Sequence, residues 1–122
     1  MNAVNDVQII IPMTGNGSRF KTAGYKLLKP FIEVHGSPMI EWVVRMFPEM
    51  ERNISFLCRD KHLGTLDYMR PTLDNVAPHA KLIQLDNWEK LGPVNDVLKI
   101  ATEIDDRAPV IICYCDFYMQ WD

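Results

Sequence analysis

Four short apolar runs, separated by helix-like stretches, constrain the fold of this chain more than any other feature of its sequence. The runs are rich in β-branched residues and almost continuous in apolarity, as is typical of strands buried on both faces of a sheet. They cover residues 7–12, 54–58, 81–85 and 110–115. Strands that alternate with helices form parallel βαβ units. The sequence therefore predicts an α/β fold, a Rossmann-like, doubly wound parallel sheet of about four strands with helices on both faces.

Three stretches between these runs have helical character, at residues 38–46, 61–73 and 92–104. The first begins with Pro38, which is compatible with the first position of a helix. The third has apolar residues at the spacing of an amphipathic helix. These residues are Val94, Val97, Leu98, Ala101 and Ile104.

The composition fits one domain with a core of its own, because the chain has 122 residues, 48% of them hydrophobic, and a net charge of −3. It excludes disorder, and the absence of a Lys/Arg cluster argues against a nucleic-acid partner. No apolar run reaches the ~18–20 residues of a membrane span, and the start lacks a secretory signal. Three cysteines at irregular positions favour a reducing, cytoplasmic location over a disulfide framework.

The segment from residue 13 to residue 37 is longer than an ordinary connection between a strand and a helix. It begins at the carboxyl end of the first predicted strand, where open α/β sheets bind their ligands. Gly15 and Gly17 let the backbone approach a ligand closely, and the N–H groups around them can line an anion-binding nest. Arg19 follows with a guanidinium group suited to phosphate oxygens, and Lys26 and Lys29 come later in the segment. The segment therefore indicates a phosphate-binding site.

Two familiar phosphate-binding loops do not fit this segment. A dinucleotide fingerprint requires Gly where Phe20 stands, and the chain has no Gly-Lys-Ser/Thr sequence of a Walker A loop. On glycine spacing alone, a simple turn at Gly15 and Gly17 with Arg19 and the lysines solvated stays open as the alternative.

The segment resembles the signature loop of the sugar-phosphate nucleotidylyltransferases, a family with a GT-A-type fold. The signature is G-x-G-[ST]-R-[FL], followed after an insert by K-P. It is matched in order by Gly15, Gly17, Ser18, Arg19, Phe20, Lys29 and Pro30. The next stretch, FIEVHGSPMIEW, is similar to the corresponding stretch of the family, with Ser37 in place of the usual Lys. The branch that makes capsule and lipopolysaccharide precursors is the most similar, although Leu28 replaces its proline.

The resemblance implies an enzyme that transfers a nucleoside monophosphate from a nucleoside triphosphate to a sugar phosphate or similar small phosphorylated acceptor, with release of pyrophosphate, in surface polysaccharide synthesis. Such a transfer depends on alignment and on charge neutralisation. By resemblance, Arg19 and Lys29 are the catalytic cations, Arg19 at the leaving phosphates and Lys29 at the α-phosphate. The resemblance implies nucleotide contacts in this loop from Met13, Thr14, Gly15, Asn16, Gly17, Ser18 and Arg19.

The resemblance also implies a metal ligand, Asp116. This residue follows the last apolar run in the sequence CDFYMQWD, where the family carries an aspartate that binds Mg²⁺. A carboxylate combined with substrate phosphates is a suitable Mg²⁺ site, so Mg²⁺ is the expected cofactor. Tyr118 stands where an Asp-x-Asp motif of glycosyltransferases of related fold would have its second aspartate, which argues against that activity. An aspartate that merely ends a strand is the alternative.

Gln84, Gly92 and Asn95 stand where the family recognises the base and the ribose. Asn95 offers both a donor and an acceptor, which a pyrimidine edge can use, so a pyrimidine nucleoside triphosphate is favoured. Two structural alternatives stay open, with Gln84 as a polar residue of a strand and with Asn95 and Asp96 as helix caps.

Members of the family are about twice as long as this chain. We therefore expect residues 1–122 to form a single nucleotide-binding domain, truncated so that it lacks the acceptor-binding half. A sheet cut there leaves an edge and an apolar face uncovered, so we expect weak stability or self-association, for example as a homo-oligomer. Two other functions stay open. One is a non-catalytic nucleotide-binding or regulatory module, and the other is a redox or metal module at Cys113 and Cys115, for which core packing is the competing explanation.

Overall fold

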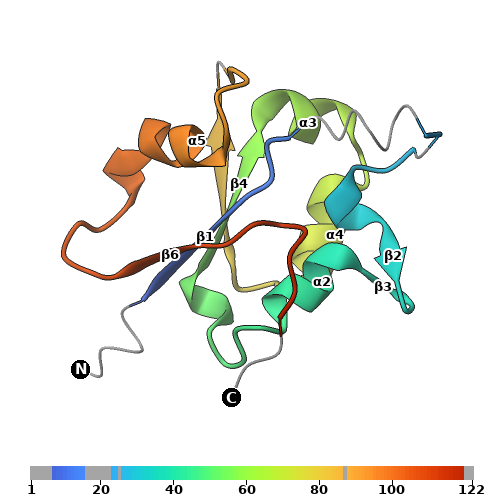
Figure 1. The fold of residues 1–122 in the computed structure, drawn as a ribbon, viewed down its shortest axis with the longest axis horizontal. Helices are drawn as coiled ribbons and strands as arrows, with labels where there is room; N and C mark the ends of the chain where they lie inside the picture. The colour runs from blue at the N-terminus through green and yellow to red at the C-terminus, as the bar shows by residue number, and fades with distance from the viewer. Residues whose placement is uncertain (1–6, 16–22, 25, 87, 120–122) are drawn as a thin grey trace.

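The computed structural model describes residues 7–15, 23–24, 26–86 and 88–119, which form a four-stranded parallel sheet flanked by helices (Figure 1). The strands are β1 Gln8–Pro12, β4 Ile54–Arg59, β5 Lys81–Leu85 and β6 Val110–Ile112. Their spatial order is β5-β4-β1-β6, and every neighbouring pair is parallel. After β1, the strands β4 and β5 are added on one side of it, and β6 then pairs with its other side. This order confirms the predicted doubly wound, Rossmann-like sheet.

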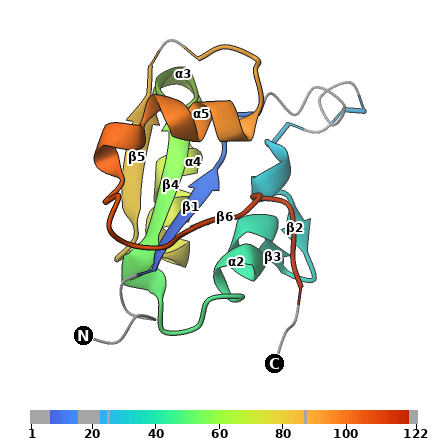
Figure 2. The ribbon, with the colours of Figure 1, turned by 60° about the vertical axis from the view of Figure 1, so that its left-hand side comes forward.

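Helices cover both faces of the sheet, as the second view makes clear (Figure 2). The α-helices are α2 Met39–Val44, α3 Asp60–Thr65, α4 Met69–Val76 and α5 Pro93–Lys99, and the 3₁₀ helices are η2 Lys29–Phe31, η3 Glu51–Asn53 and η4 Ala101–Glu103. Because side chains alternate along a strand, Ile9 and Ile11 point to one face of β1 and Ile10 to the other. Ile9 and Ile11 belong to the core that α2 and α4 cover, and Ile10 belongs to the core under α5.

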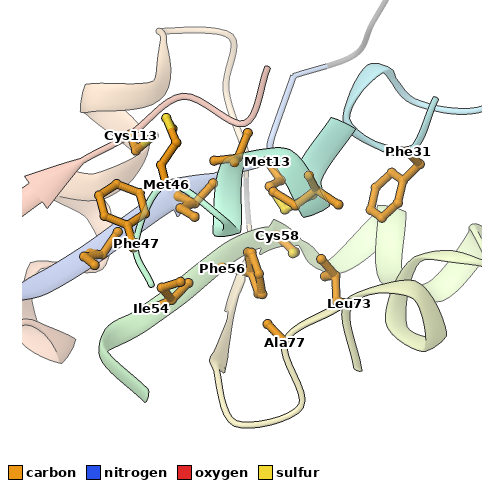
Figure 3. Packing of buried hydrophobic residues seen from close by; sticks show 14 of the residues in the cluster. Met13, Phe31, Met46, Phe47, Ile54, Phe56, Cys58, Leu73, Ala77 and Cys113 are labelled. Carbon is orange, nitrogen blue, oxygen red and sulfur yellow. The ribbon is translucent and has the colours of Figure 1, made fainter. Parts of the chain in front are cut away.

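The larger of these two cores lies on the α2 and α4 side of the sheet and extends to the connection that follows β6 (Figure 3). Its buried members shown in the figure include Met13, Phe31, Met46, Phe47, Phe56, Leu73 and Cys113. The smaller core contains Ile10, Leu57, Ile83, Leu85, Val97 and Ile100. The sheet thus separates two apolar layers, and β1 and β4 contribute to both.

Strand β6 differs from the prediction in length and in burial. It ends at Ile112, although the apolar run continues to residue 115, and all three of its residues are exposed. It lies at the edge of the sheet, where its strand partner among the described residues is β1. The prediction of a fourth strand buried on both faces is therefore wrong. Strand β5 departs from the prediction as well, because Lys81 and Gln84 are exposed and Leu82 is half-buried.

The predicted helix at residues 61–73 is two helices, α3 and α4. Proline explains the break. In one continuous helix, Pro71 would leave the carbonyl group of Asp67 without its hydrogen-bond donor and would clash with it. In α4, which begins at Met69, Pro71 lies in the first turn, where no intrahelical donor is needed.

The other two predicted helices are present with shorter bounds, α2 within 38–46 and α5 within 92–104. The buried face of α5 is not the predicted one. Asp96, Val97 and Ile100 are buried, whereas Val94 and Leu98 are exposed. Within the described ranges, no helix has both the length and the apolar character needed to cross a membrane.

The long segment after β1 contains a small hairpin, β2 Glu33–Val34 and β3 Ser37–Pro38. Its two turn residues, His35 and Gly36, have φ values of 50° and 84°. Positive φ at both central residues matches a two-residue type I′ turn, which Gly36 accommodates without strain. Trp42 of α2 fixes the hairpin, because its indole Nε1–H donates a 2.8 Å hydrogen bond to the carbonyl of Val34.

Candidate functional site

A pocket of about 380 Å³ lies at the carboxyl ends of β1 and β6. The strand order reverses between these two strands, and open α/β sheets bind ligands at such a switch point. The residues that line it come from four segments: 12–15 at the end of β1, 28–30 at η2, 88–96 before α5 and in its first turn, and 114–116 after β6. The volume is within the range of small-molecule sites.

The segment that follows β1 forms one wall. Met13, Thr14 and Gly15 all line the pocket, as predicted for the beginning of the glycine-rich loop. The N–H of Met13 donates a 2.8 Å hydrogen bond to the carbonyl of Leu57, and the Met13 side chain is buried in the larger core. The start of the loop is therefore held by the sheet. The other loop positions of the prediction lie outside the described residues, namely Asn16, Gly17, Ser18 and Arg19.

An ion pair joins two predicted site residues that are distant in the sequence. The Nζ atom of Lys29 lies 2.8 Å from Oδ2 of Asp116, and both residues line the pocket. Their side chains are 44% and 36% exposed. This exposure lets a ligand reach both charges. The fold thus brings the predicted catalytic lysine and the predicted metal ligand together at the pocket.

The segment that carries Lys29 is anchored by Tyr68 and Phe31, which are not among the described residues that line the pocket. The N–H of Leu28 donates a 3.0 Å hydrogen bond to the hydroxyl oxygen of Tyr68. The Tyr68 ring packs edge-on against Phe31, with centroids 5.2 Å apart, and Phe31 is buried in the larger core. These contacts fix the backbone of η2, while the Lys29 ammonium group stays accessible.

A buried carboxylate, Asp96, also lines the pocket. Only 1% of Asp96 is exposed. Its Oδ2 accepts a 2.5 Å hydrogen bond from the hydroxyl of Thr14 and a 3.3 Å hydrogen bond from Nε1–H of Trp88. Sequence reasoning considered Asp96 only as a helix cap, but α5 has no side-chain cap hydrogen bond. One signal in the sequence points to its burial: Asp96 is next to Val97, on a helix that has to pack against a sheet.

Trp88 also contacts a cation. The guanidinium carbon of Arg59 lies 3.9 Å from the centroid of the Trp88 ring, a cation–π geometry. Nη1 of Arg59 is also 3.3 Å from Nε2 of His62. Burial, and then the charges of Arg59 and Lys61, lower the pKa of His62, which favours the neutral imidazole beside the guanidinium group.

Two predicted base-binding residues are not among those that line the pocket. Gln84 is exposed in the middle of β5, where it is paired in register with Cys58. Asn95 is half-buried in α5, and within the described part of the chain its Nδ2 has no hydrogen-bond partner. Gly92 does line the pocket, with a φ of 99° at the start of α5. The roles of Gln84 and Asn95 stay predictions.

The three cysteines are free thiols. Burial is the main cause that raises the pKa of Cys58 to about 12 and that of Cys115 to about 12, and it also raises the pKa of Cys113. Among the residues that the structure describes, no group of three or more His, Cys, Asp or Glu side chains converges on a point. Cys113 and Cys115 follow β6 rather than lying in it, and both pack on the larger core. These contacts favour core packing over the redox or metal module.

The fold is shared with solved structures of pyrophosphorylases. The chain superposes on a nucleoside-diphosphate-sugar pyrophosphorylase from Vibrio cholerae RC9 with a TM-score of 0.66 and 23% identity, over 89% of this chain and 47% of that one. It matches a UDP-glucose pyrophosphorylase complexed with UDP-glucose with a TM-score of 0.61 and 15% identity, over 88% of this chain and 45% of that one. The chain has the fold of these pyrophosphorylases.

A UDP-glucose pyrophosphorylase from Acinetobacter baumanii is also similar, with a TM-score of 0.56 and 21% identity over 88% of this chain and 45% of that one. The chain therefore spans about half the length of the pyrophosphorylases that it matches. No family model and no curated protein matches the sequence. At these identities the likeness establishes the shared fold.

Proposed function

We propose that the pocket binds a nucleoside triphosphate and that the chain belongs to a nucleotidylyltransferase. The observation that carries this proposal is the Lys29–Asp116 pair, 2.8 Å apart, at the switch point of a sheet with the pyrophosphorylase fold. A cation beside an accessible carboxylate suits a site that binds phosphate groups together with a divalent metal ion. The Trp88 side chain offers an aromatic surface against which a base can pack.

In the proposed reaction, a phosphate oxygen of the acceptor attacks the α-phosphorus of the triphosphate. A new P–O bond forms as the bond to the oxygen that bridges to the β-phosphate breaks, and pyrophosphate leaves with that electron pair. Alignment and charge neutralisation supply most of the acceleration in such transfers. Lys29 can exchange its carboxylate partner for phosphate oxygens and stabilise charge at the α-phosphate. The backbone at Thr14 and Gly15 begins the loop assigned to the leaving phosphates.

Asp116 fits the role of the Mg²⁺ ligand in its donor chemistry. Its carboxylate is accessible and lines the pocket. Mg²⁺ is typically held by one or two carboxylates, with phosphate oxygens and water completing the shell. When bound, the metal ion neutralises phosphate charge, while Asp116 holds it and Lys29 orients the triphosphate beside it.

The acceptor in this proposal is a sugar phosphate or a similar small phosphorylated molecule, and the base is a pyrimidine. The neighbours named for UDP-glucose and for nucleoside-diphosphate sugars support this choice. A role in surface polysaccharide synthesis and a cytoplasmic location are parts of the same proposal. A nucleotide-binding module without turnover is the second candidate.

A thermal-shift screen tests the binding site. The chain is heated with CTP, UTP, dTTP, ATP or GTP, each with and without Mg²⁺. A ligand at 100 times its Kd stabilises the fold by about 2.7 kcal/mol, so one triphosphate should shift the transition, and more so with Mg²⁺. No shift with any triphosphate would refute the proposal.

Matched variants connect the shift to the pocket. Lys29→Ala and Asp116→Ala should reduce it, and Asp116→Ala should also reduce the effect of Mg²⁺. The controls are Lys81→Ala and Asp74→Ala, exposed residues on β5 and α4 that do not line the pocket. Release of pyrophosphate in the presence of a sugar phosphate then separates the transferase from the module without turnover.

A further inference from the structure

Asp96 is the least expected residue near the pocket, because a carboxylate is costly to bury. It is 1% exposed, and both of its hydrogen-bond donors, Thr14 and Trp88, come from segments that line the pocket. Its Oδ1 is buried and has no hydrogen-bond partner among the described residues. Asp96 thus joins the end of β1 to the connection before α5.

Trp88 is held from two directions. Its Nε1–H bonds to Asp96, and the Arg59 guanidinium group lies over its ring at 3.9 Å. Trp88 lines the pocket, whereas Arg59 is not among the described residues that line it. Ring orientation is therefore fixed before any ligand binds, which reduces the entropy lost on binding.

We propose that Trp88 is the residue against which the nucleobase stacks, and that Asp96 is the positioning residue that holds the indole ring for it. This inference rests on the proposed nucleotide-binding function and adds the residues that recognise the base. The lining of the pocket combines two kinds of chemistry, the charges of the Lys29–Asp116 pair and the aromatic ring of Trp88, which come from different segments. Phosphates suit the charged groups, and a flat ring system suits the indole.

The competing explanation is that Trp88 only fills space, since it packs against the smaller core that contains Ile10 and Leu57. A packing role and a stacking role predict different ligand dependence. Loss of packing weakens the whole pocket, for any ligand. Loss of stacking weakens binding only of ligands that carry a base.

The test compares CTP, UTP and ATP with inorganic tripolyphosphate, all with Mg²⁺, by calorimetric titration. Trp88→Ala should weaken binding of the nucleoside triphosphates roughly 5- to 150-fold, the value of one base–aromatic stack, and leave tripolyphosphate binding unchanged. Trp88→Phe keeps an aromatic ring and should lose less. Trp42→Phe, in the hairpin contact of α2, is the matched control and should bind as the wild type does.

The Asp96 variants test the positioning role. Asp96→Asn keeps an oxygen that can accept from both Thr14 and Trp88, so it should retain nucleotide binding. Asp96→Ala removes that acceptor and should lower nucleoside triphosphate affinity roughly tenfold, the value of a good hydrogen bond, without a matching loss for tripolyphosphate. The ratio of the two affinities is a readout that general destabilisation does not change. If Asp96→Ala does not fold, the Asn variant and Trp88→Phe decide the question.

Fluorescence gives an independent readout. With Trp42 and Trp121 both changed to Phe, Trp88 is the one remaining tryptophan of the three in the chain. Its emission should change with CTP, UTP or ATP and stay constant with tripolyphosphate. If the wild type binds a nucleoside triphosphate and folded Trp88→Ala binds it equally well, the stacking role is refuted while the proposed function stands. If the wild type binds none of these triphosphates, both are refuted.

Discussion

Strands β1 and β6 are neighbours in the sheet and each supplies one wall of the pocket, yet their environments are opposite. Ile9 and Ile111 are partners in the register, as are Ile10 and Ile112. Ile9 and Ile10 are 0% and 2% exposed, whereas Ile111 and Ile112 are 38% and 40% exposed. The residue type is the same in each pair, so position in the sheet alone makes the difference. The site therefore combines a wall built on the buried centre with a wall built on an edge.

The edge also lacks the charged side chains that often protect one. No charged residue occurs between residues 108 and 115, although edge strands commonly carry charges that prevent pairing with other chains. Asp116 comes directly after this uncharged stretch. The predicted metal ligand thus follows the least covered strand of the sheet, while Thr14 follows a strand in which four of the five residues are buried.

The largest expected effect comes from truncating one isoleucine in each strand. Ile9→Ala should lower the free energy of unfolding by about 2–5 kcal/mol, because it leaves a cavity in the core. Ile111→Ala should lower it by at most about 1.5 kcal/mol, because less apolar area is lost from a buried environment. The two variants are matched, since both exchange Ile for Ala in a strand and share the change in strand propensity. Urea denaturation measures both, and equal losses would refute the contrast between centre and edge.

The sequence predicts the two buried strands well and the edge strand poorly, for a physical reason. Apolar runs identify β1 and β4 because a parallel sheet buries both of their faces. The run at residues 110–115 has the same composition, but composition does not reveal whether a neighbour covers the strand. The face of α5 is missed similarly. Val94 and Leu98 fit a helical apolar stripe, yet both are exposed. The helix instead buries Ile100 and also Asp96, which accepts hydrogen bonds from Thr14 and Trp88.

The sequence predicts those site residues that belong to short motifs. Lys29 and Asp116 are identified by resemblance to a family, and the fold brings them to 2.8 Å from each other. The contact of Asp96 with Thr14 depends on how α5 lies against the end of β1, and no local pattern encodes this. No short motif marks Trp88, and its proposed role at the pocket follows from its contacts with Asp96 and Arg59.

The second prediction concerns alkaline pH and the centre of the sheet. Burial raises the pKa of Cys58, on β4, from 9.0 to about 12. Below pH 9 the thiol is protonated in both the folded and the unfolded chain, so its titration does not lower the free energy of unfolding. As the pH rises from 9 towards 12, only the unfolded chain releases the proton, and stability falls by about 1.4 kcal/mol for each pH unit above 9.

Urea midpoints at pH 8 and pH 10 measure this loss. Cys58→Ala removes the titrating group and should show a smaller decrease between the two pH values than the wild type. Its lower absolute stability does not affect the comparison, because each variant is compared with itself. An equal decrease in both proteins would mean that Cys58 does not cause the pH dependence.

The third prediction concerns the edge itself. Self-association through β6 is expected, because its three residues are apolar, exposed and uncharged. Ile111→Lys places a charge on this strand and should weaken association at least about tenfold, which corresponds to about 1.4 kcal/mol. Sedimentation velocity over a range of concentrations measures the change, and Lys81→Ala on β5 is the control. A wild type that stays monomeric at every concentration would refute this expectation.

The smallest effect on stability is expected at the Lys29–Asp116 pair, where Asp116 belongs to the wall of the pocket that follows β6. The Lys29–Asp116 pair is accessible to solvent, and exposed ion pairs typically contribute about 0–1 kcal/mol. Lys29→Met should therefore leave the urea midpoint almost unchanged, while the thermal shift produced by a nucleoside triphosphate decreases. A large loss of stability would show that the pair holds β6 and η2 together, and the edge wall would then be as firmly built as the centre. A small loss together with weaker nucleotide binding would mean that the two charges serve the ligand rather than the fold, which is what their exposure and their place at the switch point of the sheet predict.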